Sequence, residues 1–432
     1  MCTMDAKTGG FSRLLMIFAV SSLAASTVFA VSVDELERRI DVLAHEIERL
    51  KLEDLPSSAD RSERGMGPAA TKVYRVSHGV SIGGYGEALY RNFEGDKTDE
   101  ADFLRAVLYA GYKFSDKWLF NSELELEHAS TGEEGSSSVE FAYLDYLHSS
   151  ALNIRAGLVL IPMGFLNELH EPTTFLSATR PDIEGVIIPT TWRENGLGIY
   201  GDVGDFTYRT YVVTGLKGEV FTSKGLRGGR QKGSKSEAED FAWVGRLDFS
   251  GIPKLLVGGS VYLGNSGQSL MVDGDGVDAF TQIYEAHSEL NIGGLNVRLM
   301  GTFAAIDDVD DLNRNITASS VKPDGSPALI EDVDSVGEEL YGWYVQLGYD
   351  VLSRSEVGEM SLTLYGRYEQ LDTQDKVPGE FENNPSTEVE TWTIGLNFKP
   401  IDQVVFKAEY QGVDRKGTDS EDQINLAMGY VF

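Results

Sequence analysis

Large apolar side chains occupy every second position near the carboxyl end of the chain, and small or polar residues separate them. The apolar set is Ile424, Leu426, Met428, Tyr430 and Phe432. A period of two predicts a β-strand with one face in an apolar medium. Similar segments recur along the chain from about residue 76 onward, so the pattern predicts a long series of antiparallel strands.

The alternation predicts about 16 strands within residues 76–432. The expected strands are 81–91, 104–114, 118–128, 139–147, 152–160, 196–200, 206–213, 241–249, 255–263, 283–292, 295–303, 340–349, 361–369, 391–398, 404–410 and the terminal segment. Their connections alternate between short turns, such as 293–294, and long segments, such as 304–339. Because short turns at one end and long loops at the other are typical of an all-β transmembrane barrel, we expect these strands to close into one.

One strand indicates which face of the barrel is polar. Residues 118–127 alternate between apolar residues and a polar set that includes Glu123, Glu125 and Glu127. Buried carboxylates without partners are costly, so this face must meet water or basic residues. Basic residues lie at inward positions of other predicted strands: Arg105, Arg155, Arg209, Arg246, Arg298, Arg367 and Lys407. We therefore expect a wide, charged, water-filled lumen.

The amino-terminal part predicts three further segments. Lys7 and Arg13 precede an apolar run, a pattern typical of a secretory signal peptide, so we expect residues 1–30 to be removed by cleavage near Ala30. Residues 31–54 carry an apolar seam at spacings of three and four: Val33, Leu36, Ile40, Leu43, Ile47 and Leu50. Residues 55–75 are rich in Pro, Gly and Ser, which predicts a flexible linker.

The seam predicts a short α-helical coiled coil that joins copies of the chain in the periplasm. A helix of this length is marginal in water by itself, so pairing between subunits would stabilise it. β-branched residues followed by Leu favour two strands in isolated peptides. The alternative is a single amphipathic helix that lies on the mouth of the barrel.

Composition excludes several classes of function. The chain has 37 Lys and Arg against 68 Asp and Glu, a net charge of −31, so we expect no nucleic-acid partner. Cys2 is the single cysteine and lies in the expected signal peptide, which excludes cysteine catalysis in the mature chain. No nucleophile elbow, phosphate-binding loop or dinucleotide fingerprint stands out, so we expect neither an enzyme nor a cofactor.

The connection 161–191 is the most unusual part of the chain, because it combines charged residues with prolines and aromatic anchors such as Phe165 and Phe175. Loops of this length are usually functional, so we expect it to fold inward as a constriction loop. Six polar residues in and beside the loop would set the field there: Glu168, His170, Glu171, Arg180, Arg193 and Glu194. The first three resemble metal ligands, but a second His at helical spacing is missing, so no metal site is expected.

Two features resemble known outer-membrane proteins. The terminal strand, with Tyr430 and Phe432 on one face, resembles the assembly signal of Gram-negative outer-membrane barrels. Gly157 and Pro162 before the long loop, and Trp192 with Gly196 after it, resemble the phosphate-selective porin family. The resemblance implies a homo-oligomer, with a trimer favoured, that contacts the lipid bilayer and lipopolysaccharide and is inserted by the outer-membrane assembly machinery. The strongly acidic chain does not predict phosphate preference.

The sequence thus predicts an outer-membrane porin, a passive diffusion channel that selects small hydrophilic or ionic solutes by pore size and lumenal charge. Two alternatives stay open: an adhesin or envelope-organising structural barrel, and a barrel-type outer-membrane enzyme.

Overall fold

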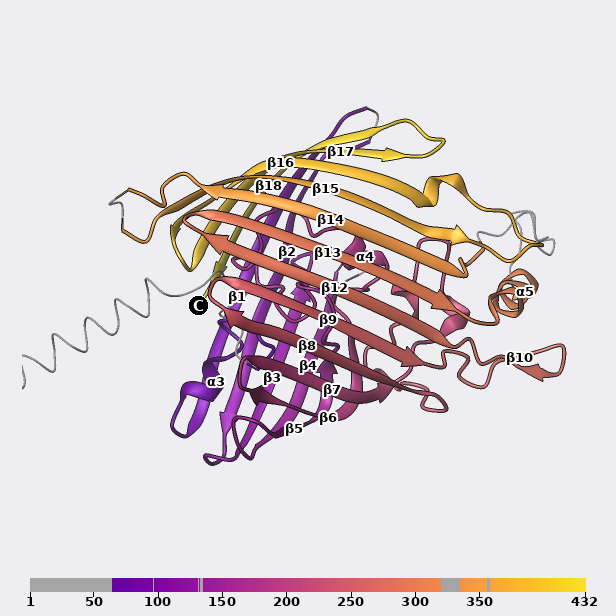
Figure 1. Cartoon of the computed structure of the whole chain (residues 1–432), viewed down its shortest axis with the longest axis horizontal. Helices are drawn as coiled ribbons and strands as arrows, with labels where there is room; N and C mark the ends of the chain where they lie inside the picture. The colour runs from indigo at the N-terminus through magenta and orange to yellow at the C-terminus, as the bar shows by residue number, and fades with distance from the viewer. Residues whose placement is uncertain (1–63, 96, 131, 133–134, 320–334, 356–357) are drawn as a thin grey trace, which may run out of the picture. The chain divides into compact units, whose positions relative to one another are not determined.

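Sixteen antiparallel strands close into one barrel, in which β1 pairs with β18. The computed structural model describes residues 64–95, 97–130, 132, 135–319, 335–355 and 358–432 (Figure 1). The prediction of about 16 antiparallel strands is confirmed. The expected signal peptide, the coiled-coil seam from Val33 to Leu50 and residues 55–63 of the expected linker lie outside the described residues.

The barrel strands are β1 Gly79–Phe93, β2 Glu100–Lys113, β3 Trp118–Glu127, β4 Ser136–Leu147, β5 Asn153–Leu160, β6 Arg193–Val203, β7 Phe206–Thr214, β8 Phe241–Ile252, β9 Leu255–Gly264, β12 Thr281–Ile292, β13 Leu295–Ile306, β14 Glu339–Asp350, β15 Ser361–Lys376, β16 Glu388–Ile401, β17 Val404–Arg415 and β18 Glu421–Val431. A small hairpin, β10 Met271–Val272 with β11 Asp275–Gly276, lies in the connection from β9 to β12.

The helices are short, and they lie in the connections and in the segment before β1. The α-helices are α3 Lys72–Arg75, α4 Ile183–Val186 and α5 Val309–Ser319, and the 3-10 helices are η2 Gly218–Val220, η3 Arg227–Gly229 and η5 Pro385–Thr387. None of the helices in the described part of the chain is long and apolar enough to cross a membrane.

The connections differ in length between the two ends of the barrel. Tight turns follow β2, β4, β6, β8, β12 and β16, at the left in Figure 1. The long connections lie at the opposite end, together with α5 and β10. We refer to these ends as the turn end and the loop end. The segregation of turns and loops matches the expectation from the sequence.

The outer face of the barrel is apolar and the inner face is charged. In β18, Leu426 is 46% exposed on the outside, whereas the neighbouring Asn425 is fully buried. In β3, Leu124 and Leu126 are likewise exposed, whereas Glu123 and Glu125 are buried. Side chains on a strand alternate between its two faces, which explains this pattern.

Protein fills much of the interior, where the sequence suggested water. The predicted inward residues Glu123, Arg155, Arg209, Arg246 and Lys407 are each at most 8% exposed. The β5–β6 loop, residues 161–192, folds into the barrel, carries α4 and covers these residues except Arg155, which is covered by residues 64–74. The physical reason is that apolar residues of the loop pack with inward-facing wall residues, such as Tyr109 and Phe141, into one buried cluster.

Candidate functional site

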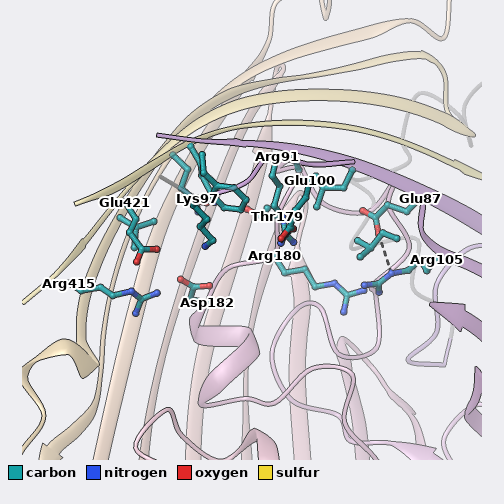
Figure 2. Close-up of a pocket in the computed structure, with 17 residues that line it drawn as sticks. Glu87, Arg91, Lys97, Glu100, Arg105, Thr179, Arg180, Asp182, Arg415 and Glu421 are labelled. Atoms are coloured by element: carbon teal, nitrogen blue, oxygen red, sulfur yellow. Dashed lines mark hydrogen bonds and ion pairs between the residues drawn. The ribbon is translucent and has the colours of Figure 1, made fainter. Parts of the chain in front are cut away.

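A charged cavity of about 390 Å³ lies beside the β5–β6 loop at the loop end of the barrel (Figure 2). Strands β1, β2, β17 and β18 line one side, and residues 178–180 and 182 of the loop line the other. The basic side chains are Arg91, Lys97, Arg105, Arg180 and Arg415, and the acidic ones are Glu87, Glu100, Asp182 and Glu421. We call this space the vestibule. Charges of both signs face it.

A second cavity of about 430 Å³ adjoins the vestibule, because Asp182, Arg415 and Glu421 line both. Its remaining lining comes mainly from β15, from the β15–β16 connection and from residues 223–224 of the β7–β8 loop. The two cavities together follow one side of the inward-folded loop.

Carboxylates of the barrel wall hold the backbone of the β5–β6 loop. The Glu409 carboxylate on β17 accepts hydrogen bonds from the backbone N–H groups of Ala178 at 2.7 Å and Thr179 at 3.2 Å. The Glu369 carboxylate on β15 accepts one from the Ile183 backbone N–H at 2.5 Å. Hydrogen bonds to charged groups are stronger than neutral ones, so these contacts fix the loop beside the vestibule.

Basic side chains of the same wall bind carbonyl and hydroxyl oxygens of the loop. The Lys407 ammonium donates to the Ser177 carbonyl at 2.8 Å, and the Arg367 guanidinium donates to the Ser177 hydroxyl at 2.8 Å. The Lys399 ammonium donates to the Thr173 carbonyl at 2.7 Å. The charged inner face therefore serves, on this side of the barrel, to position the loop.

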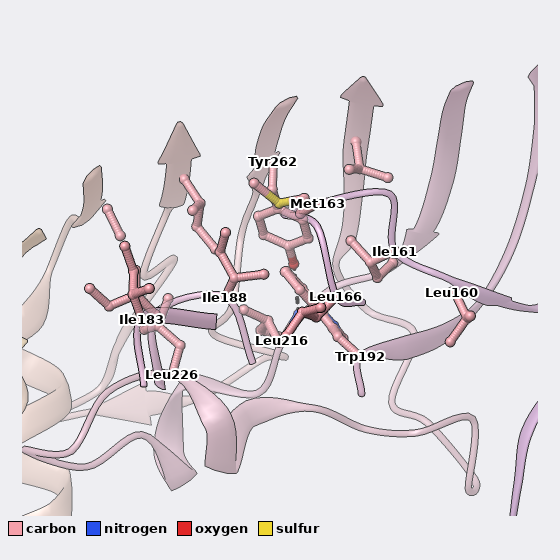
Figure 3. Close-up of a cluster of buried hydrophobic side chains, with 14 of the residues drawn as sticks. Leu160, Ile161, Met163, Leu166, Ile183, Ile188, Trp192, Leu216, Leu226 and Tyr262 are labelled. Carbon is pink, nitrogen blue, oxygen red and sulfur yellow. Dashed lines mark hydrogen bonds between the residues drawn. The ribbon is translucent and has the colours of Figure 1, made fainter. Parts of the chain in front are cut away.

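Apolar packing holds the other side of the loop (Figure 3). Trp192 is fully buried, and its ring centroid lies 4.8 Å from that of Tyr262 on β9. The Tyr262 hydroxyl accepts a hydrogen bond from the Leu216 backbone N–H at 3.0 Å, which brings the β7–β8 loop into the same cluster. The cluster anchors two loops to the wall at once.

Residues 64–75 enter the turn end of the barrel and pack against the β5–β6 loop. The Glu171 carboxylate accepts hydrogen bonds from the backbone N–H groups of Ala69 at 3.0 Å and Ala70 at 3.2 Å. The Tyr74 hydroxyl donates to Asp145 on β4 at 2.7 Å. This part of the expected linker 55–75 is thus buried, because its small residues allow close backbone packing: a Cβ on Gly67 would lie 2.5 Å from the Glu171 Oε1 atom.

One of the six predicted constriction residues, Arg180, is among the described residues that line the vestibule. Glu168 instead forms an ion pair with Arg209 at 3.2 Å. Glu194 accepts a hydrogen bond from the Gln231 backbone N–H at 2.8 Å. Glu171, His170 and Arg193 are likewise buried in contacts within the barrel.

The predicted lumenal residues lie on the inner face, where most find partners of opposite charge. Ion pairs join Arg155 to Asp145 at 2.9 Å and Arg298 to Glu289 at 3.0 Å. Arg209 and Arg246 share Asp248, at 2.8 and 2.9 Å. The list of inward residues is completed by Arg105, Arg367 and Lys407, the buried Glu123 and Glu125, and the half-buried Glu127.

The loop residues that resembled metal ligands do not converge. His170 turns away from Glu168 and Glu171 and instead faces Glu123 on β3 and Glu140 on β4, with its Nε2 atom 3.3 and 3.4 Å from their carboxylate oxygens. All three residues are buried.

Sequence reasoning missed Glu140 because the alternation of β4 is interrupted there. Glu123 pairs with Phe141 and Leu124 pairs with Val139, so Glu140 is the extra residue of a β-bulge. Both Glu140 and Phe141 are consequently buried. A bulge has no clear signature in a hydrophobic pattern, and bulges are enriched near functional sites.

Sequence reasoning also missed the wall residues that hold the loop or line the vestibule. Glu409 and Glu369 follow the inward alternation of β17 and β15, so the same pattern that identified Lys407 and Arg367 contains them. Asp182 and Arg415 have no comparable signal, because their position depends on how the loop folds against the wall.

Burial shifts the pKa of several residues of the β5–β6 loop, among them Arg180 and Glu184. It lowers the pKa of the Arg180 guanidinium, and the neighbouring Arg105 lowers it further. Burial raises the pKa of Glu184 in α4, although this carboxylate accepts hydrogen bonds from the Leu166 backbone N–H at 2.7 Å and the Tyr344 hydroxyl at 3.0 Å. Arg180 therefore brings an incompletely compensated positive charge to the vestibule.

Solved structures with a similar fold are outer-membrane proteins. Salmonella typhi OmpF in complex with daunomycin has a TM-score of 0.55 at 10% identity, over 82% of this chain and 98% of that one. The outer membrane channel DcaP of Acinetobacter baumannii has a TM-score of 0.51 at 14% identity, over 82% and 97%. At these identities the likeness concerns the fold, a porin-like closed barrel.

No protein-family model matches the chain. An uncharacterized protein of Aquifex aeolicus is 38% identical over 391 residues, which cover 89% of this chain and 87% of that protein. At this identity and coverage, the chain belongs to the same family as the Aquifex aeolicus protein.

Proposed function

We propose that the protein is an outer-membrane porin, a passive diffusion channel for small hydrophilic or ionic solutes. The observation that carries this proposal is the charged vestibule, which lies inside a closed barrel between the wall and the inward-folded β5–β6 loop. A loop that narrows a barrel from within can leave a path on one side of it, and the vestibule is a space lined by charges on one side of this loop.

The outer face supports a location in a lipid bilayer. Exposed apolar residues follow each strand, for example Leu197 at 56% and Leu247 at 52% exposure. A transmembrane barrel needs such an apolar band, and aromatic residues such as Trp118 and Phe206 near the strand ends suit the membrane interfaces. We propose the outer membrane of a Gram-negative bacterium, with lipid, lipopolysaccharide and the assembly machinery as partners.

The vestibule would select solutes by local charge rather than by the charge of the whole chain. The charges of its five basic and four acidic side chains nearly balance, although the whole chain has a net charge of −31. Charges beyond about 8–10 Å are largely screened at physiological salt. The Nη2 atom of Arg180 is buried and has no hydrogen-bond partner among the described residues. We therefore expect weak ion selectivity, with Arg180 favouring anions.

We also propose a homotrimer, with residues 31–54 as a periplasmic oligomerisation helix. A Vibrio cholerae OmpT structure described as a trimer form shares the fold, with a TM-score of 0.50 at 12% identity over 83% of this chain and all of that one. The apolar seam from Val33 to Leu50 in the sequence is the feature behind the proposed oligomerisation helix.

Single-channel recording in a planar bilayer tests the function. The refolded mature protein should give discrete conductance steps, and a salt gradient should give a small reversal potential. Arg180→Glu should shift the reversal potential toward cations, whereas Arg354→Glu, in the exposed β14–β15 connection, should leave it unchanged. If Arg180→Glu has the same reversal potential as the wild type, this would contradict passage of ions through the vestibule.

The filled interior favours a second candidate, a structural or adhesive barrel without a continuous path. Two observations support this second candidate. The inner face between β3 and β9 is covered by protein, and residues 64–75 are inserted into the barrel. Folded, heat-modifiable protein that gives no conductance steps would support this candidate over the channel.

A further inference from the structure

His170 places one ring nitrogen between two buried carboxylates. Its Nε2 atom lies 3.3 Å from Glu123 Oε1 and 3.4 Å from Glu140 Oε2. The two glutamates are fully buried, and His170 is 1% exposed. The three side chains come from β3, from the bulge of β4 and from the inward-folded loop, so the fold assembles them from separate parts of the chain.

The hydrogen-bond partners of Glu140 bind one carboxylate oxygen, and the other oxygen faces His170. Oε1 accepts hydrogen bonds from the Thr191 hydroxyl at 2.6 Å and the Arg193 guanidinium at 3.0 Å. Oε2 accepts no hydrogen bond from a basic or hydroxyl side chain among the described residues, and it is the atom that faces the imidazole; the Glu125 carboxyl is a further neighbour of Glu140. Outer partners of this kind orient carboxylates that bind metal ions.

The other ring nitrogen of His170 fixes the tautomer. Nδ1 lies 3.1 Å from the Asn167 carbonyl oxygen, which can only accept, so we assign the proton to Nδ1. In a neutral imidazole, the lone pair of Nε2 then points at the two carboxylates. This arrangement needs a cation between the three groups, and an Nδ1–H bond to a backbone carbonyl is a common feature of metal-binding histidines.

A proton on Nε2 accounts less well for the distances. The described chain has two other histidines in contact with carboxylates: His128 lies 2.7 Å from Asp102, and His287 lies 2.6 Å from Glu285 and 3.0 Å from Asp248. Charge-assisted N–H···O bonds are about 2.7–2.9 Å long. The contact of His170 with Glu123 at 3.3 Å is at the long end for a hydrogen bond, and a single N–H would have to be shared with Glu140 at 3.4 Å.

These distances match the edges of a tetrahedral metal site. Zinc binds His nitrogen and carboxylate oxygen at about 2.0–2.2 Å, and a tetrahedron of that size has edges of about 3.3–3.6 Å. We propose that His170, Glu123 and Glu140 bind a divalent transition metal ion, with Zn²⁺ the best fit. One imidazole beside two carboxylates suits Zn²⁺ better than Ca²⁺ or Mg²⁺, which prefer oxygen ligands throughout.

The site would have a structural effect that is independent of transport. The ion would join the β5–β6 loop to β3 and β4, a different part of the wall from β15 and β17, which carry the tethers described above. Three protein ligands leave a fourth position, which a water molecule can fill.

Zinc binding by the folded, full-length mature protein tests the site. Protein stripped with EDTA, reloaded with Zn²⁺ and desalted should retain about one zinc per chain by mass spectrometry, because the site has three protein ligands. Glu123→Gln and His170→Gln should each bind Zn²⁺ at least about tenfold more weakly. Glu285→Gln is the matched control: it also removes a buried carboxylate beside a histidine, but Glu285 and Asp248 contact opposite nitrogens of His287 and cannot share one ion. This control should bind like the wild type.

Two further measurements separate binding from folding. Co²⁺ in place of Zn²⁺ should give the visible absorption of a tetrahedral site in the wild type, and the two ligand variants should lose it. Heat-modifiable migration of each variant checks that the barrel has folded. Wild-type protein that retains no zinc, or ligand variants that bind zinc as tightly as the wild type, would overturn the proposal whether or not the barrel conducts.

Discussion

Glu409 accepts a hydrogen bond from the backbone N–H of Ala178 at 2.7 Å, across 231 residues of sequence. This contact ties the loop beside the vestibule to β17. The same carboxylate also accepts from the Tyr365 hydroxyl at 2.5 Å and from the Asn425 amide at 3.0 Å. One wall residue thus holds the loop and joins three strands on the inner face.

Glu409→Ala should loosen the loop and destabilise the barrel. Each buried donor left without an acceptor costs about 1–3 kcal/mol, and Glu409 accepts from Ala178, Thr179, Tyr365 and Asn425, so we expect the free energy of unfolding to fall by about 4 kcal/mol or more. Urea unfolding of the protein in detergent measures this change, and single-channel recording should show noisier current. Glu359→Ala, at an exposed site in the β14–β15 connection, should change neither.

Gly164→Ala should destabilise the loop, because Gly164 has a φ of +69° and a Cβ there would lie 2.7 Å from the Glu184 Oε2 atom. The backbone conformation alone costs a non-glycine residue about 1–2 kcal/mol. Gly185→Ala is the control, since its Cβ would meet nothing within 4 Å and Gly185 lies in α4, where Ala is the better helix former. In thermal unfolding, Gly164→Ala should have a lower Tm than the wild type, and Gly185→Ala should have an equal or higher Tm.

The pH dependence of stability should reveal the buried Glu184. Burial raises its pKa in the folded protein above the usual value of a glutamate, so the folded state binds more protons than the unfolded state in the pH interval between the two pKa values. The stability of the wild type relative to Glu184→Gln should therefore decline as the pH rises through this interval, and then stay constant. Urea unfolding at a series of pH values measures the difference. A difference that grows with pH would show that the carboxylate is stabilised in its ionised form.

Leu426→Lys should impair membrane insertion, because Leu426 lies on the apolar face of β18 and is 46% exposed there. A Lys near the midplane of the membrane costs about 2–4 kcal/mol. Gln423→Lys places the same side chain on the same strand but in the vestibule, so it should assemble normally. The fraction of heat-modifiable protein in outer-membrane preparations compares the two variants, and equal yields would refute the assigned register.

The barrel was predictable because its signal is local. Polar and apolar residues alternate along each strand because its two faces lie in different environments. Asn425 is fully buried on the inner face, whereas its neighbour Leu426 is 46% exposed on the outer face. The inward register of Arg155 and Glu123 follows from the same rule. The alternation of residues does not show which segment covers the inner face. That depends on how the β5–β6 loop folds back into the barrel.

The candidate site was less predictable because it depends on contacts between distant segments. His170 was recognised for its neighbours in sequence, Glu168 and Glu171, yet its carboxylate partners are Glu123 and Glu140. Glu140 reaches the interior through a bulge that breaks the alternation. The composition of residues 64–75 suggested a linker, yet the same glycines permit close packing with Glu171.

If the barrel is the channel proposed above, the residues that tether the β5–β6 loop affect both its permeability and its stability. Glu409, Lys407 and Arg367 border the loop and also hold it, so a substitution there that speeds passage of a solute would also destabilise the fold. Proteins near their stability threshold tolerate few such losses. Adaptation to a new solute is therefore expected to begin at residues such as Lys97 and Glu100, which line the vestibule without holding the loop.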